Sequence, residues 1–341
     1  SVEPLSKQFY KDLSHWYFAS LKEVKFPNDR NENEYSLNAN AMIRMITRIM
    51  FVWFMKQKQL VPNDLFEKDQ LDEMLNYSDS NDSTYYKAIL QNLFFATLNT
   101  PREKGRKFVS RQYGVQNFFR YKRFLNEPNK FVELMDQIPF LNGGLFENLD
   151  IVKPEEEVEI RIDCFTDPKK NESKLRVPDY LFFGTRNVDI SEYFESGNYG
   201  NVEITGLIDI LNRYDFTIDE NTPYDQEVAL DPELLGLVFE NLLASYNPET
   251  QSTARKESGS FYTPRPIVDY MVEESLVHYI SNDTGLDNDN LRQVFSSADD
   301  QPFDQESNRS LIIKSISNLK IIDPACGSGA FPMGALQKMV H

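Results

Sequence analysis

The chain has 341 residues, of which 40% are hydrophobic, and this length is enough for about two or three domains with apolar cores. Its net charge of −17 argues against a protein that coats nucleic acid indiscriminately. Only Cys164 and Cys326 are present, and no apolar run is long enough to span a membrane. We therefore expect a cytoplasmic protein without a disulfide framework.

The charge is distributed unevenly along the chain. Residues 1–150 carry 20 Lys/Arg and 19 Asp/Glu, whereas residues 151–341 carry 16 and 34. Nucleic-acid phosphates attract cations, so any DNA contact of this chain is expected in its first half.

Apolar residues recur at helical spacing through most of residues 1–150. The pattern predicts helices over residues 7–24, 37–59, 64–76 and 84–98. Ser36 is the expected N-cap of the second helix. We predict a mostly α-helical domain that ends near the Gly-Gly turn at 143–144.

A basic stretch interleaved with aromatic residues follows the fourth helix. Its eight cations are Arg102, Lys104, Arg106, Lys107, Arg111, Arg120, Lys122 and Arg123. Cations beside aromatic rings suit contacts with a nucleic-acid backbone and its bases. The alternative is a solvated segment whose aromatic residues belong to the core.

Residues 151–205 change to a β-type pattern. Apolar and charged residues alternate from 158 to 162, which predicts a strand, and residues 175–183 are its expected partner. The Glu-Ser-Lys at 172–174 matches part of a nuclease motif but lies in a predicted loop, so we do not predict a nuclease.

The remaining part of the chain returns to helices. They are predicted at 206–213, after Asp231 and at 265–280. The polar residues 245–258 indicate a domain boundary. Residues 281–309, rich in polar side chains, are predicted to form a surface excursion.

A short apolar run and a glycine-rich turn lie near the end of the chain. Leu319 to Ile322 is apolar on both faces, which is typical of a buried parallel strand, and residues 330–339 are predicted to be helical. In a strand–turn–helix unit of this kind, backbone N–H groups face a ligand. The turn lacks the third glycine of a dinucleotide fingerprint and the Lys of a phosphate loop. The remaining alternatives for this turn are a site for S-adenosylmethionine and a purely structural role.

The segment Asp323-Pro-Ala-Cys-Gly-Ser-Gly-Ala-Phe331 resembles the cofactor motif of N6-adenine DNA methyltransferases. In that family a Tyr-Thr-Pro segment precedes the cofactor strand, and Tyr262-Thr-Pro264 matches it. The resemblance implies an S-adenosylmethionine-dependent enzyme. The residues that it implies for cofactor binding are Tyr262, Thr263, Pro264, Asp323, Pro324, Ala325, Cys326, Gly327 and Gly329.

The wider pattern is similar to bifunctional type II restriction–modification enzymes of subtype G or L. Segments 93–99, 140–147 and 239–262 resemble their helical connector and junction. The resemblance implies a connector at 1–150, a β insertion at 151–205, a helical junction at 206–250 and the start of a methyltransferase domain at 251–341. The expected fold class is a mostly α region with a small β insertion, followed by a truncated α/β Rossmann-like domain.

This sequence departs from the family at the catalytic motif. The family places Asn-Pro-Pro-Tyr/Phe after the cofactor strand to bind a flipped adenine, and the seven residues after Gly334 do not contain it. We therefore expect no catalytic residue in this chain, with the motif after His341. The predicted partner is double-stranded DNA, and the incomplete sheet predicts self-association. The alternatives are a non-catalytic DNA-binding or scaffolding module, and a methyltransferase of RNA or protein.

Overall fold

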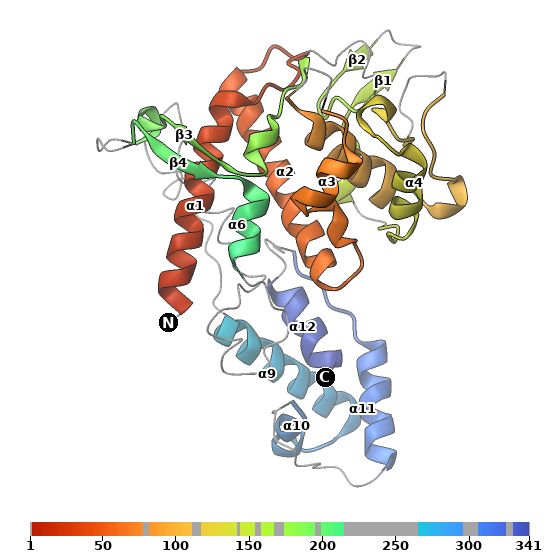
Figure 1. Cartoon of the computed structure of the whole chain (residues 1–341). Coiled ribbons are helices and arrows are strands. Elements are labelled where there is room, and N and C mark those ends of the chain that lie inside the picture. Colours follow the sequence, from red (N-terminus) through yellow and green to blue (C-terminus); the bar gives the residue numbers. More distant parts are fainter. Residues whose placement is uncertain are drawn as a thin grey trace. The chain divides into compact units, whose positions relative to one another are not determined.

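The computed structural model divides the chain into two compact units, Ser1–Asp231 and Pro232–His341 (Figure 1). The structure describes residues 2–77, 82–110, 117–141, 144–153, 158–166, 174–194, 199–214, 265–295, 306–324 and 330–340. The predicted regions 1–150 and 151–205 both fall in the first unit, and the division lies inside the predicted junction 206–250. None of the helices in the described ranges has the length and apolar character needed to cross a membrane.

Helices dominate both units. The α-helices of the first unit are α1 (Val2–Glu23), α2 (Glu34–Gln57), α3 (Lys68–Met74), α4 (Pro128–Asp136) and α6 (Leu207–Arg213). Those of the second unit are α9 (Arg265–Thr284), α10 (Asn288–Phe295), α11 (Glu306–Asn318) and α12 (Ala330–Val340). The predicted helices at 7–24, 37–59, 206–213, 265–280 and 330–339 are thus confirmed, with boundaries that shift by a few residues.

Short 3-10 turns connect these helices in the first unit. They are η1 (Asn63–Leu65), η4 (Arg102–Lys104), η5 (Lys122–Phe124), η6 (Gly144–Phe146), η9 (Asp179–Leu181) and η10 (Ser191–Tyr193).

The core of the first unit forms around α1 and α2, which pack against each other. Both helices bury a tryptophan, Trp16 on α1 and Trp53 on α2. The indole N–H of Trp16 donates to the carbonyl of Leu181, so α1 is tied to a segment 165 residues away. The cap of α2 differs from the prediction, because the side chain of Asn33 accepts from the backbone N–H of Ser36, at 3.1 Å.

The predicted helix at 84–98 forms with a wider turn than an α-helix. It consists of two π-helical segments, η2 (Tyr86–Leu90) and η3 (Asn92–Leu98), and every residue in them is buried. The hydroxyl groups of Thr97 and Thr100 donate to carbonyls five residues earlier, those of Asn92 and Phe95. Sequence periodicity does not distinguish a π-helix from an α-helix over so short a segment.

Two small antiparallel sheets belong to the described part of the first unit. β1 (Ile151–Lys153) pairs with β2 (Val158–Ile160), and β3 (Thr185–Val188) pairs with β4 (Val202–Thr205). The strand predicted from 158 is confirmed, but its expected partner at 175–183 is wrong. Residues 151–153 pair with β2 instead, and Arg176 forms a bridge with Lys25. The β3–β4 pair crosses α1 and packs against it through β4 (Figure 1).

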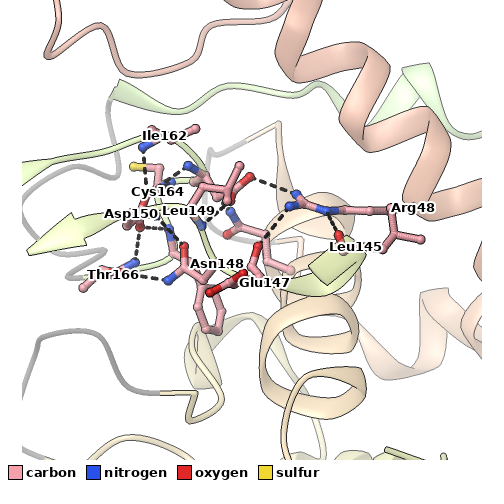
Figure 2. Close-up of polar contacts among 12 residues, drawn as sticks. Arg48, Leu145, Glu147, Asn148, Leu149, Asp150, Ile162, Cys164 and Thr166 are labelled. Atoms are coloured by element: carbon pink, nitrogen blue, oxygen red, sulfur yellow. Dashed lines mark hydrogen bonds and ion pairs between the residues drawn. The ribbon is translucent and has the colours of Figure 1, made fainter. Parts of the chain in front are cut away.

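A buried polar network holds residues 145–150 against α2 and the loop 162–166 (Figure 2). Asp150 is 5% exposed, and its carboxylate accepts five backbone N–H groups, those of residues 162 to 166, at 2.8–3.0 Å. Cys164 adopts a left-handed φ of 56° within that loop. Burial of the Cys164 thiol raises its pKa to about 12, so the thiol stays protonated at neutral pH.

The second unit contains helices where the polar composition predicted a surface excursion. α10 lies within 281–309 and α11 begins near its end, and the buried Leu291 and Ile312 pack with Val277 and Ile280 of α9. A few apolar residues therefore anchor two helices whose composition is otherwise polar.

The predicted strand at 319–322 is not formed in the structure. Among the described residues, no segment pairs with it, and Ile321 and Ile322 are 53% and 88% exposed. A strand needs hydrogen-bonding partners on a neighbouring strand, and an apolar sequence does not supply them. The Rossmann-like sheet therefore remains an expectation.

Candidate cofactor site

The second unit packs α12 against α9 over a small apolar cluster of Val268, Val272, Leu276 and Ala335. Gly334 lies at this contact, where an added Cβ would come within 2.9 Å of a methyl group of Val268. The absence of a side chain lets the two helices approach closely. Lys338 of α12 also forms an ion pair with Glu273 of α9, at 2.9 Å.

A cavity of about 290 Å³ lies beside this contact. Its walls come from α9, from the segment at 319–323, which is neither helix nor strand, and from the start of α12. The residues that line it are Met271, Val272, Ser275, Leu276, Leu319, Ile321, Ile322, Asp323, Phe331, Pro332 and Ala335. Nearly all of these side chains are apolar, and Ser275 uses its hydroxyl within α9 to donate to the carbonyl of Met271, at 2.6 Å.

Asp323 is the charged residue among those that line the cavity. It is half-buried and follows the apolar residues 319–322 directly, before the glycine-rich residues 325–329 of the sequence and the N-terminus of α12. A carboxylate at an otherwise apolar cavity can accept hydrogen bonds from a ligand cation. The structure therefore brings together Asp323, an apolar cavity and a helix N-terminus.

Several sequence-predicted cofactor residues lie outside the described residues. They are Tyr262, Thr263, Pro264, Ala325, Cys326, Gly327 and Gly329. Pro324 is described and exposed, next to Asp323. Their cofactor roles stay predictions.

Sequence reasoning missed the cavity residues on the helices, notably Met271 on α9 and Phe331 and Pro332 on α12. A signal was present, because Met271 follows Tyr262-Thr-Pro264 by a few residues, and Phe331 follows the glycine-rich turn directly. An apolar residue on a helix is usually core, however, so the cavity needed the tertiary structure.

The cations of the basic stretch divide into exposed and buried groups. Arg102, Lys104, Lys107, Lys122 and Arg123 are exposed, whereas Arg106 and Arg120 are 6% and 1% exposed. Arg111 lies outside the described residues.

Both buried guanidinium groups donate to backbone carbonyls of the first unit. Arg106 reaches the carbonyls of Met135 and Thr97, at 2.5 and 2.8 Å, and two others. Arg120 reaches those of Phe165 and Phe118, at 3.3 and 3.1 Å. These contacts stabilise the fold, so the predicted DNA contact now rests on the exposed cations.

The aromatic residues of the same stretch are mainly part of the core. Phe119 and Phe124 are fully buried, and Phe119 packs edge-on against Phe131 of α4, with ring centres 5.4 Å apart. A bridge between Phe108 and Phe119 joins the two halves of the stretch. The rings of Phe119 and Phe124 are unavailable for stacking on bases, whereas those of Phe108 and Phe118 are half-buried, which weakens one of the two reasons for predicting a nucleic-acid contact.

Comparison with curated proteins finds a relative in Methanocaldococcus jannaschii described as a "putative type II restriction enzyme and methyltransferase". It is 25% identical over 371 aligned residues, which cover 99% of this chain and 26% of the relative. The chain thus spans about a quarter of the relative's length. No family model matches the chain, and no solved structure gives a significant match.

Proposed function

We propose that the chain is part of a restriction–modification methyltransferase that transfers a methyl group from S-adenosylmethionine to N6 of adenine in double-stranded DNA. The observation that carries the proposal is the position of Asp323 at an apolar cavity, between the apolar segment 319–322 and α12. The relative's description adds support for a restriction–modification methyltransferase, and the resemblance of the motifs favours adenine as the target.

The cavity suits one end of S-adenosylmethionine. The carboxylate of Asp323 would accept hydrogen bonds from the ammonium of the methionine part, and the apolar walls would contact its carbon atoms. When bound, this cofactor supplies an electrophilic methyl group. The chain's own residues would bind and orient it, because the Asn-Pro-Pro-aromatic motif that binds the adenine amine is not in this sequence.

Calorimetric titration of S-adenosylmethionine into the chain tests the proposal. Loss of a charge-assisted hydrogen bond costs about 1.5–3 kcal/mol, so Asp323→Ala should weaken binding about tenfold or more. Asp283→Ala is the matched control, because it removes an exposed carboxylate of the same unit outside the cavity and should leave the affinity unchanged. Equal affinity of the Asp323→Ala and native chains would make the turn structural and favour the non-catalytic DNA-binding or scaffolding module.

Methyl transfer requires a separate assay. With tritiated cofactor and DNA of mixed sequence, we expect no label in DNA from this chain, because it lacks the motif that binds the adenine amine. A longer protein that contains the motif should produce N6-methyladenine. Label at cytosine, or in RNA or protein, would contradict the adenine assignment.

A further inference from the structure

A second cavity, of about 270 Å³, lies in the first unit at the start of α2. It is lined by Phe26, Pro27, Asp29, Arg30, Glu32, Leu37, Asn40, Ala41, Arg44, Leu149, Arg161 and Ile162. The proposed methyltransferase chemistry uses none of these residues.

Two arginines line this cavity with buried nitrogens that have no hydrogen-bond partner among the described residues. They are the Nε and Nη1 of Arg161 and the Nε of Arg44. Arg161 is 2% exposed, and its third nitrogen, Nη2, forms an ion pair with Glu159, at 3.3 Å. A buried N–H group without an acceptor costs about 1–3 kcal/mol, more when charged, so these donors call for an acceptor.

The acidic residues that line the cavity are already engaged. Asp29 accepts from the backbone N–H of Arg161, at 2.9 Å, and from Lys174, at 3.2 Å. Glu32 pairs with Arg30 at 3.7 Å, where both side chains are 46% exposed. Because these carboxylates have cationic or N–H partners of their own, Arg44 adds positive charge that no carboxylate among the described lining residues balances.

Two neighbouring backbone donors are also occupied, and Arg30 pairs with Glu32, so the guanidinium groups of Arg44 and Arg161, together with the exposed amide of Asn40, supply the donors of the site. The N–H of Ile162 donates to Asp150, and that of Leu149 donates to Asp163. The first turn of α2 is capped by the side chain of Asn33. The cavity also has apolar lining residues, Phe26, Pro27 and Leu37.

We propose that this cavity binds the phosphate group of a small organic molecule. Phosphate offers tetrahedrally placed oxygens that can accept from donors on two side chains at once, and arginine is well suited to it. The volume lies slightly below the roughly 300–1,000 Å³ of typical small-molecule pockets, so the ligand is small. The apolar wall accommodates its uncharged part.

Calorimetric titration of adenosine monophosphate and of inorganic phosphate into the chain tests the inference. A titration with sodium chloride of equal ionic strength is the reference. We expect both to bind, and Arg44→Gln to weaken each about tenfold, as for one lost charge-assisted hydrogen bond. Arg44→Lys should retain part of the affinity, because it keeps the charge. Arg186→Gln, at an exposed arginine of the same unit outside the cavity, is the matched control and should bind like the native chain.

Arg161→Gln should abolish binding if this variant folds. If it does not fold, Arg44→Gln still tests the inference, because Arg44 is only partly buried and its replacement should leave the fold intact. Absence of binding to the native chain, or equal binding by Arg44→Gln, would overturn the inference. It would also be overturned if Arg44→Gln weakened only the binding of duplex DNA, because the phosphate would then come from a DNA backbone. Inorganic phosphate carries no adenosine, so its binding tests this cavity independently of the cofactor cavity of the second unit.

Discussion

Arg48 and Asp163 form a buried ion pair that joins α2 to the loop at 162–166. The Nη1 of Arg48 lies 2.9 Å from the Oδ1 of Asp163, and the two side chains are 4% and 3% exposed. The other nitrogens of Arg48 donate to the carbonyls of Leu145 and Glu147, at 2.9 and 3.1 Å (Figure 2). One guanidinium thus connects α2 to two segments that lie 97 to 115 residues further along the chain.

Arg48→Met should lower the free energy of unfolding by about 3–5 kcal/mol, because it leaves the carboxylate of Asp163 buried without its cation. Urea denaturation followed by tryptophan fluorescence measures this change. The double variant with Asp163→Leu should recover part of the loss. Lys68→Met is the control, because it breaks an exposed pair with Asp72 and should cost less than about 1 kcal/mol. Equal losses at the two sites would contradict the structural role of Arg48.

Asp179 should make stability depend on pH. Burial raises the pKa of Asp179 to about 7. Hydrogen bonds from the backbone N–H groups of Tyr85 and Thr84 lower this pKa, the charge of Asp82 raises it, and the charge of Lys68 lowers it. The folded-state pKa lies above the unfolded value of 3.8, so the folded protein holds this proton more tightly. This contribution to stability is complete below about pH 4 and is lost as the pH rises through about 7.

Asp179→Asn removes this titration. The free energy of unfolding of Asp179→Asn should therefore increase relative to that of the native chain as the pH rises from about 4 to 7. Urea denaturation of both proteins at each pH measures this difference. The difference between the two proteins cancels the titration of the other groups. A difference that stays constant over this range would mean that Asp179 is charged in the folded protein throughout.

The exposed cations of the basic stretch should contribute DNA affinity that depends on salt and not on sequence. Lys104→Glu, Lys107→Glu and Lys122→Glu together should weaken duplex binding by the chain, and the log–log salt slope should fall by about 0.9 per lost phosphate contact. Lys130→Glu, at an exposed lysine of α4, is the control. Binding and slope that match the native chain would assign the stretch to packing alone.

Ile321 and Ile322 should exchange their backbone hydrogens rapidly in dilute solution. Among the described residues no strand pairs with them, and their side chains are exposed. An apolar segment with unpaired backbone groups also favours association, so protection should increase with protein concentration. Hydrogen exchange monitored by mass spectrometry at several concentrations measures this. Slow exchange in a demonstrated monomer would show that this chain completes the pairing by itself.

The sequence by itself determined the positions of most helices and the motif around Asp323. Helical periodicity is a local property, so it predicted α1, α2, α9 and α12 without knowledge of their neighbours. The succession of apolar run, aspartate and glycine-rich turn is also local. It predicted a ligand site at the segment that lines the cavity in the structure.

Only the tertiary structure decided which polar residues are structural and which are exposed. Arg106 and Lys107 are adjacent in the sequence, yet Arg106 is buried on carbonyls of distant segments and Lys107 is exposed. Asp150 and Arg48 depend equally on partners that other elements bring to them. Hydrogen bonding and desolvation depend on which atoms surround a group, and strand formation at 319–322 depends on a neighbouring strand, so neither can be read from the local sequence.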